Sequence, residues 1–243
     1  NGVVKNSFSS AQVTGDSSIG GLVGFHESGG VENSYSLANV SGKDSVGGLI
    51  GQSGISDDIK GYIHDSYSAA TVSASTGAYK GFGGLVGMSY SSISDSYSTA
   101  SLNNLIEGQN IVMVGGLVGH LINADVNNSH SIVDFNNTLG QVDSLGGLVG
   151  YYENTNSGSQ KIRNSWVTGK IISTDLGGAT GGLVGNSEGY IDNSHFEGTL
   201  EGTMYVGGLV GGTSPTSIIS NSYANTNITA TNNSGGLVGS NSG

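Results

Sequence analysis

Several residue types that often anchor a protein's chemistry are scarce in this chain. Among its 243 residues there is no cysteine, one proline and one tryptophan. The lack of cysteine excludes disulfide bonds, thiolate zinc sites and a cysteine nucleophile. With a single proline beside 44 glycines, the composition is neither that of collagen nor that of a proline-rich linker. The glycine content therefore has another cause.

Positive charge is also scarce. Seven Lys and Arg residues stand against 18 Asp and Glu residues, which gives a formal net charge of −11, and Arg163 is the only arginine. Nucleic acids and anionic membranes bind clustered Lys and Arg, so we expect neither as a partner. The chain has no apolar run of about 18 residues and no charged-then-apolar leader. We therefore expect no membrane insertion by this stretch.

Glycine instead marks a tandem repeat. The pentad Gly-Gly-Leu-Val-Gly at 20–24 returns seven times, with leucine always third and only Ile50 replacing the valine. A second motif, Asn/Asp-Ser-aromatic, alternates with the pentad. Successive pentads begin 26 to 36 residues apart, a spacing typical of solenoid repeats. The first glycines of the eight pentads are Gly20, Gly47, Gly83, Gly115, Gly146, Gly181, Gly207 and Gly235.

The segments between the motifs have the periodicity of strands. In 34–40, small or apolar residues alternate with aromatic or polar ones, as in a strand with one buried face. A repeat of this length buries its apolar edge only by stacking on the next repeat. We predict an all-β fold, a β-solenoid of about eight coils, as a right-handed parallel β-helix. The alternative is a two-sheet β-roll. Residues 1–243 would form a single repeat domain, excised from a longer protein.

Two corners of each coil can be predicted. The residue two places before each Asn/Asp of the second motif is branched and apolar, as Val31 is before Asn33. Val31 and Ser34 can both face inward only if the chain turns between them, and Asn and Asp tolerate the left-handed conformation. We predict a bend at each Asn/Asp, with the stacked side chains forming a ladder. The paired glycines predict a second corner, with the leucines in the core and the valines outward or against a neighbouring layer.

The recurrent Gly-Leu-Val-Gly and Gly-Leu-Ile-Gly cores resemble the GLUG motif, a short repeat of large bacterial surface or secreted proteins that include immunoglobulin A peptidases and adhesins. All eight copies, from 21–24 to 236–239, match this core, and the repeats cover essentially the whole chain. The resemblance implies an extracellular segment, at the bacterial cell surface or secreted. It carries no catalytic residues to transfer, and the chain lacks a His-Glu-x-x-His metallopeptidase motif.

One candidate binding feature is the aromatic position of the second motif. Stacked coils would align Tyr97, Trp166 and their equivalents into a ladder, which could stiffen the rod or offer ring faces to sugars. His130 and His195 occupy this column and are expected to substitute for aromatic rings. Three histidines at no shared phase are expected at the surface: His26, His64 and His120.

A second candidate feature is insert length. From the Asn/Asp to the next glycine pair, repeats three to six use 17 to 20 residues and the other repeats use 14. Insertions in consecutive repeats lie on one face and often form its binding surface. We predict a ridge or shallow groove there, with an added short strand as the alternative, and surface knobs after the pentads at 47–51 and 146–150. The candidate ligand-binding residues are Tyr79, Phe82, Tyr97, Ile106, Tyr151, Tyr152 and Trp166.

These features predict a structural and adhesive module that presents a binding face to a glycan or a host surface protein. We expect no enzymatic activity and no cofactor, although Asp57 and Asp58 could bind calcium, and a monomer as a fragment. One alternative is a polysaccharide-active enzyme with paired carboxylates, for which Asp65 and Asp95 share a column. Six asparagines in the same column favour a turn role instead. The other alternative is an ice-binding solenoid that uses the valine column as a flat face.

Overall fold

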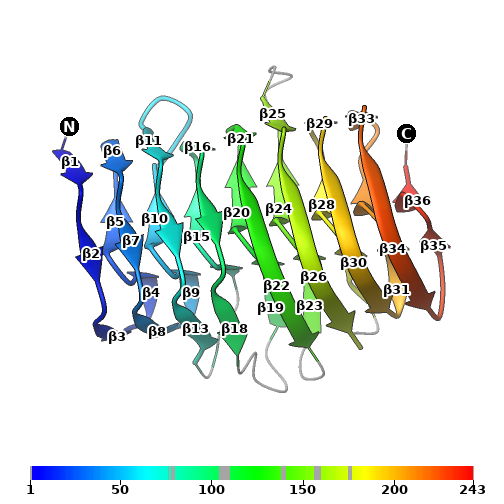
Figure 1. The fold of residues 1–243 in the computed structure, drawn as a ribbon, viewed down its shortest axis with the longest axis horizontal. Helices are drawn as coiled ribbons and strands as arrows, with labels where there is room; N and C mark the ends of the chain where they lie inside the picture. Colours follow the sequence, from blue (N-terminus) through cyan, green and yellow to red (C-terminus); the bar gives the residue numbers. More distant parts are fainter. Residues whose placement is uncertain are drawn as a thin grey trace.

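The computed structural model describes residues 2–75, 77, 80–103, 110–137, 141–155, 160–174 and 177–242. The described strands are paired in parallel and stack into five sheets that run along a rod (Figure 1). Within these ranges no residue is helical, and thus no helix is long and apolar enough to cross a membrane. The prediction of an all-β solenoid is confirmed.

The five sheets are numbered in the order in which the chain enters them within a coil. Sheet 1 contains β1 (Gly2–Lys5), β6 (Gly29–Glu32), β11 (Gly61–His64), β16 (Ser92–Ser94), β21 (Val126–Asn127), β25 (Lys161–Arg163), β29 (Tyr190–Asp192) and β33 (Ile218–Ser220). Sheet 2 contains β2 (Phe8–Ser9), β7 (Tyr35–Ser36), β12 (Tyr67–Ser68), β17 (Tyr97–Ser98), β22 (His130–Asn137), β26 (Trp166–Ser173), β30 (His195–Gly202) and β34 (Tyr223–Ala230). Sheet 3 contains β3 (Gln12–Thr14), β8 (Asn39–Gly42), β13 (Thr71–Ala74) and β18 (Ser101–Asn103).

The remaining strands flank the pentads. Sheet 4, before them, contains β4 (Ser17–Gly20), β9 (Asp44–Gly47), β14 (Gly81–Gly83), β19 (Asn110–Gly115), β23 (Gln141–Gly146), β27 (Ala179–Gly181), β31 (Met204–Gly207) and β35 (Ser234–Gly235). Sheet 5, after them, contains β5 (Val23–His26), β10 (Ile50–Ser53), β15 (Val86–Ser89), β20 (Val118–Ile122), β24 (Val149–Glu153), β28 (Val184–Ser187), β32 (Val210–Thr213) and β36 (Val238–Asn241).

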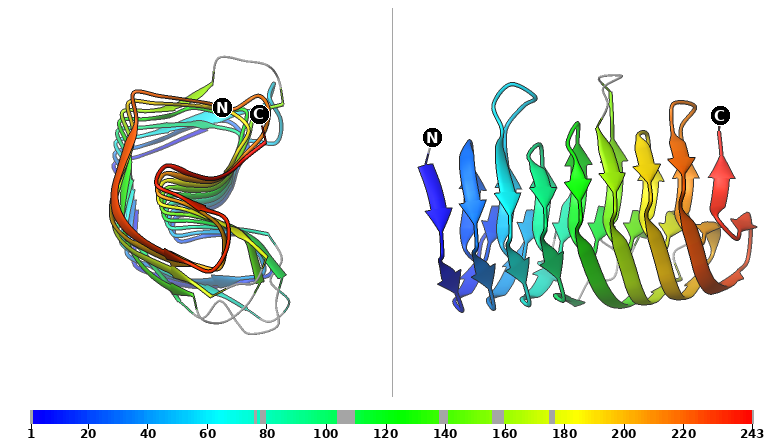
Figure 2. Two further views of the ribbon diagram at one scale, coloured as in Figure 1. Left: turned by 90° about the vertical axis from the view of Figure 1, so that its right-hand side faces the viewer. Right: turned by 45° about the horizontal axis from the view of Figure 1, so that its top comes forward.

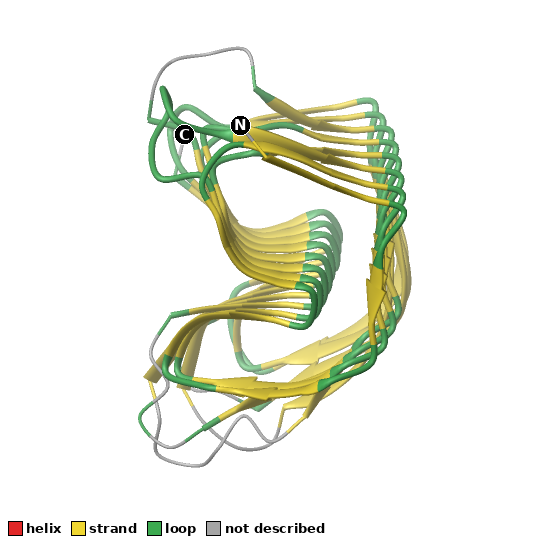
Figure 3. Cartoon of the chain, turned by 90° about the vertical axis from the view of Figure 1, so that its left-hand side faces the viewer, coloured by secondary structure: helices red, strands yellow, loops and turns green. Residues whose placement is uncertain are grey.

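The coils are right-handed. Seen from the C-terminal end (Figure 2, left), the chain runs anticlockwise from sheet 1 down through sheet 2 while it advances toward the viewer. The cross-section is indented, because sheets 4 and 5 fold back toward the interior and meet at the pentad (Figure 3). The outer surfaces of these two sheets therefore face each other across the indentation.

The first predicted corner forms at the Asn/Asp of every second motif. Asn164 and its seven equivalents all have left-handed backbones, with φ between 44° and 51°. In the middle of the rod, Asn164 Nδ2 donates to Asn128 Oδ1 at 3.2 Å, and Asn193 Nδ2 donates to Asn164 Oδ1 at 2.8 Å. The bend and the asparagine ladder are both confirmed. In the last coil the pattern changes, since Asn221 Nδ2 donates to Asp192 Oδ1.

The serine after each corner has a role that the sequence pattern did not reveal. The backbone amide of Ser66 donates to the hydroxyl of Ser96 in the next coil at 3.1 Å, while the Ser66 hydroxyl donates to the carbonyl of His64 at 2.9 Å. The same amide-to-hydroxyl bond between coils recurs along the column from Ser7 to Ser194. Because the left-handed residue interrupts the sheet hydrogen bonding, the hydroxyl supplies the acceptor that the buried amide requires.

The second corner forms at the glycine pairs, as predicted, but for a different reason than positive φ. No paired glycine has a φ in the left-handed region. A Cβ on the first glycine of any pair would lie 1.8 to 2.1 Å from the carbonyl oxygen three residues later. A Cβ on the second would, in the first seven pairs, lie 2.0 to 2.3 Å from the carbonyl of its equivalent in the next coil. Close backbone approach therefore requires glycine at both places.

The core runs the length of the rod. In the six inner pentads the leucine and the following valine or isoleucine are both 0% exposed. Of the two places expected for the valine column, the outward one is therefore wrong: in these six pentads both residues belong to the one hydrophobic cluster. The flat valine surface that ice binding would use is not formed. The first and last coils are more open, with Leu237 37% exposed.

The long segment after β10 bends over neighbouring coils instead of projecting as a free knob. Lys60 Nζ donates to the carbonyl of Asn123 at 3.3 Å, and Asn123 Nδ2 donates to Asp57 Oδ2 at 3.1 Å. Asn123 Nδ2 also donates to Thr155 Oγ1, at the start of the second predicted knob, whose residues 156–159 lie outside the described ranges. The two long segments thus meet at Asn123.

Candidate ligand-binding groove

The aromatic column of the second motif is a continuous stack on sheet 2. Neighbouring ring centroids are 4.0 to 6.5 Å apart and the rings are tilted by 3° to 15°. The members are Phe8, Tyr35, Tyr67, Tyr97, His130, Trp166, His195 and Tyr223. His130 and His195 act as aromatic substitutes, as predicted. Each inner ring is covered on both faces, so Tyr97 and Trp166 offer a ligand ring edges and not the faces on which sugars stack.

The other predicted binding residues are scattered. Phe82 and Tyr152 are 0% exposed, so their predicted contact with a ligand is wrong, because their side chains fill the core. Tyr79 and Ile106 lie outside the described residues, as does much of the predicted ridge. Tyr151, adjacent to Tyr152 on β24, faces the opposite way and lines a pocket.

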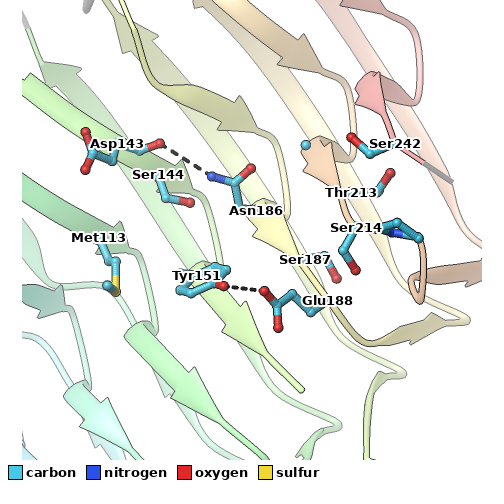
Figure 4. A pocket seen from close by; sticks show the side chains of 12 residues that line it. Met113, Asp143, Ser144, Tyr151, Asn186, Ser187, Glu188, Thr213, Ser214 and Ser242 are labelled. Atoms are coloured by element: carbon cyan, nitrogen blue, oxygen red, sulfur yellow. Dashed lines mark hydrogen bonds between the residues drawn. The ribbon is translucent and has the colours of Figure 1, made fainter. Parts of the chain in front are cut away.

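This pocket lies between the outer surfaces of sheets 4 and 5, in the C-terminal half of the indentation (Figure 4). Its volume is about 420 Å³, within the range of roughly 300–1,000 Å³ typical of small-molecule sites. The lining residues are Met113, Asp143, Ser144, Tyr151, Asn186, Ser187, Glu188, Gly212, Thr213, Ser214, Pro215 and Ser242. Of the seven candidate binding residues only Tyr151 is among them, while Met113, Asp143 and Ser144 belong to the long inserts of repeats four and five.

The residue directly after each pentad forms a column along this groove. Parallel register aligns Phe25, Gln52, Met88, His120, Tyr151, Asn186, Gly212 and Ser240. The fifth glycine of the pentads closes the floor: a Cβ on Gly119 would lie 2.4 Å from the backbone nitrogen of Phe82 in sheet 4. The column beside this floor therefore provides the side chains that distinguish one part of the groove from another.

Two aromatic–glutamate pairs occupy the middle of this column. Tyr151 donates its hydroxyl hydrogen to Glu188 Oε1 of the next coil, and Figure 4 shows the two side chains lying toward each other. One coil earlier, His120 Nε2 lies 2.9 Å from Glu153 Oε2, and the His120 and Tyr151 rings are stacked at 5.2 Å. The same relation is thus repeated in two successive layers, each aromatic residue reaching a glutamate in the following coil.

Burial controls the protonation of these groups. Burial, assisted by the charge of Lys80, lowers the pKa of His120 to about 4, so the imidazole is neutral at neutral pH, and its tautomer with hydrogen on Nε2 can donate to Glu153 Oε2. Burial and the hydrogen bond to Glu188 raise the pKa of Tyr151, which keeps its phenol protonated. Burial, together with the charges of Glu188 and Asp57, raises the pKa of Glu153. Perturbed groups of this kind in a groove are typical of functional sites.

Three other polar side chains around the pocket donate hydrogen bonds to the protein. Asn186 Nδ2 donates to the carbonyl of Asp143 at 3.5 Å, a contact drawn in Figure 4. The Ser144 hydroxyl donates to the carbonyl of Gly150 at 2.6 Å, and Thr213 Oγ1 donates to Asn241 Oδ1 at 2.9 Å. These three bonds hold the Asn186, Ser144 and Thr213 side chains in place around the pocket.

The remaining acidic and histidine candidates have other positions in the fold. Asp95 serves the corner ladder, since its Oδ1 accepts from Asn128 Nδ2 at 3.2 Å, and Asp65 has the same left-handed backbone. The expectation of a surface position for His26 is wrong: it is 6% exposed and its Nδ1 lies 3.0 Å from the Ser53 hydroxyl. Within the described ranges, no three His, Asp or Glu residues are grouped to hold a metal ion. Calcium binding at Asp57 and Asp58 stays a prediction.

Comparison with known proteins gives no relative. No family model, no curated protein sequence and no solved structure matches this chain. The resemblance to GLUG repeats therefore rests on the motif alone, and the function has to be inferred from the groove.

Proposed function

We propose that the chain is a structural and adhesive module of a bacterial extracellular protein, and that the groove between sheets 4 and 5 binds a glycan. The observation that supports this proposal is the pocket of about 420 Å³ lined by Tyr151, Asn186 and Glu188. An aromatic side chain beside a few fixed polar groups is the usual composition of a small-molecule site. The extracellular setting rests on the resemblance to GLUG repeats.

The fold suits such a role mechanically. Each coil is fixed to the next by sheet hydrogen bonds, stacked rings and the serine and asparagine columns. A ligand bound to the rod would therefore be held at a fixed position and orientation, since nearest-neighbour coils form one continuous unit. The pocket favours a glycan over a host protein, because protein partners need much larger contact surfaces.

A glycan array, followed by titration calorimetry on the strongest ligand, tests the proposal. We expect Tyr151→Ala and Asn186→Ala each to weaken binding about fivefold to thirtyfold, since each removes about 1–2 kcal/mol of contact. Tyr97→Ala, in the aromatic stack, is the matched control and should bind as the unaltered protein does. Loss of binding in Tyr97→Ala alone would move the site to sheet 2, and no binding to any glycan would contradict the proposal.

A polysaccharide-active enzyme is the second candidate, and one observation favours it. The Glu153 carboxyl lies at hydrogen-bond distance from His120, and the nearby charge of Glu188 contributes to its raised pKa. Two carboxyl groups in different environments are the requirement for acid–base cleavage of a glycosidic bond. Incubation of each bound glycan with the protein and with Glu153→Gln, followed by assay of new reducing ends, decides between the two: release that depends on Glu153 favours the enzyme.

A further inference from the structure

We propose that the groove pocket selects an amino sugar, with its ammonium group bound at Glu188. This inference rests on the proposed glycan-binding function and specifies the ligand class. It follows from the charge of the pocket and from the donors and acceptors that its side chains leave available.

The charge around the pocket has one sign. Asp143 and Glu188 both line it, and among its described lining residues there is no Lys, Arg or His. Glu153 lies close enough to Glu188 for its pKa to be affected. The whole chain carries a net charge of −11. A cation therefore gains attraction on approach and on binding, whereas an anionic sugar acid would be repelled.

Hydrogen bonding gives the same preference independently. Tyr151 already donates to Glu188, Asn186 Nδ2 donates to a carbonyl, and Thr213 donates to Asn241. A carboxylate accepts several hydrogen bonds, so Glu188 can accept from a ligand as well as from Tyr151. An ammonium group has three donors and no acceptor, so it matches this site. An N-acetyl group has a single N–H donor and no charge, so it satisfies the Glu188 carboxylate less well.

Glu188 is placed to receive such a group. Its side chain is half-buried and accepts the Tyr151 hydroxyl at Oε1, which fixes the orientation of the carboxylate at the pocket wall. The Tyr151 ring adds an apolar surface beside this charge, as Figure 4 shows. A sugar ring that rests against Tyr151 would bring an amino substituent to Glu188, and the fixed carboxylate would not need to reorganise on binding.

Calorimetric titration with two matched probes tests this inference: a β-1,4-linked glucosamine oligomer and its fully N-acetylated counterpart, both at pH 6 and low salt. The proteins are the unaltered chain, Glu188→Gln and Glu201→Gln. The Glu188→Gln substitution keeps an acceptor for the Tyr151 hydroxyl and removes only the charge. Glu201 is exposed on β30, in sheet 2, so its substitution removes the same charge away from the groove and measures the non-specific attraction of a polycation.

We expect the glucosamine oligomer to bind the unaltered chain more tightly than the acetylated one. Glu188→Gln should weaken its binding by about tenfold to a hundredfold, as for loss of a charge-assisted hydrogen bond. Glu201→Gln should change it less than twofold. Equal binding of both probes, or equal effects of the two substitutions, overturns the amino-sugar inference while leaving a glycan site at Tyr151 and Asn186 in place. If no glycan binds the chain at all, the proposed function fails as well.

Discussion

Substitution of a single glycine in a central pentad should unfold the rod at a much lower denaturant concentration. Gly147 is the second glycine of the fifth pentad, and its backbone φ is one that alanine tolerates. A Cβ at this position would lie 2.2 Å from the carbonyl oxygen of Gly182 in the next coil and 2.7 Å from Val167 Cγ1. Gly147→Ala therefore tests the steric effect of a Cβ at this corner and not the effect of the backbone angle.

The expected cost follows from the contacts that must be relieved. An ordinary carbon–oxygen contact is roughly 1 Å longer than the distance at Gly147, so two coils must move apart locally. That movement disrupts the bonds from the Gly116 amide to Gly146 and from the Gly147 amide to Gly181, at 3.2 and 3.3 Å. Each bond contributes about 0.5–1.5 kcal/mol, and overpacking adds about 1–3 kcal/mol. Gly147→Ala should therefore destabilise the fold by about 2–6 kcal/mol.

Gly236 provides the matched control, because it is the second glycine of the last pentad and a Cβ there would meet nothing within 4 Å. Urea unfolding of both variants, followed by circular dichroism and by tyrosine and tryptophan fluorescence, measures the difference. Two probes are needed because repeat arrays can depart from two-state unfolding. Gly236→Ala should cost less than about 1 kcal/mol. If the two variants unfold at the same urea concentration, close coil approach is not the reason for the paired glycines.

Three further predictions concern the other columns. The folded pKa of His120, about 4, lies below its unfolded value of about 6.5, so the unfolded chain binds more protons between these values. The free energy of unfolding should fall by up to about 3 kcal/mol as pH drops through that range. Urea unfolding at pH 7.5 and at pH 4.5 measures this fall, which should be smaller in His120→Asn than in the unaltered chain. Asn164→Ala should cost about 2–5 kcal/mol in urea unfolding, from about 1–2 kcal/mol for its left-handed backbone and about 0.5–1.5 kcal/mol for each of two ladder bonds; Asn164→Gly should recover the backbone part only, and equal costs would contradict this. Tyr67 stacks between two rings at 4.8 and 4.9 Å, so thermal unfolding should show Tyr67→Ala about 1–3 kcal/mol less stable and Tyr67→His, which keeps a ring, within about 1 kcal/mol.

The coil and its corners could be predicted because each is dictated by contacts that repeat. A left-handed residue at the position of Asn33 is required in every layer, and few residue types tolerate it. The glycine pairs likewise marked a corner. The sequence could not show that sheets 4 and 5 fold inward there. A glycine indicates that another part of the backbone approaches closely, but it does not identify which element approaches.

Two errors had a signal in the sequence. Adjacent residues on a strand point to opposite faces, so Tyr151 and Tyr152 could not both face a ligand, and the structure buries Tyr152. Phe82 occupies the place of Val46 and Val114 before the glycine pair, a column that is apolar in six of eight repeats. Its burial could have been inferred from that column. Residues 104–109 and 138–140 lie outside the described ranges, so the predicted ridge stays a prediction.

The location of the groove site illustrates how a repeat protein separates folding from binding. Stacking restricts the residue types in successive layers wherever side chains touch their own equivalents: the pentad has leucine in all eight copies, and the column of stacked rings on sheet 2 contains only aromatic residues and histidine. The column directly after the pentad contains eight different residues, so stacking restricts its composition less, although the rings of His120 and Tyr151 stack within it. A residue of this column can therefore change in one coil without loss of the fold. Two residues of the column, His120 and Tyr151, each pair with a glutamate of the following coil. In such a molecule, the column with the least repetition beside an indented surface is where a binding site should be sought first.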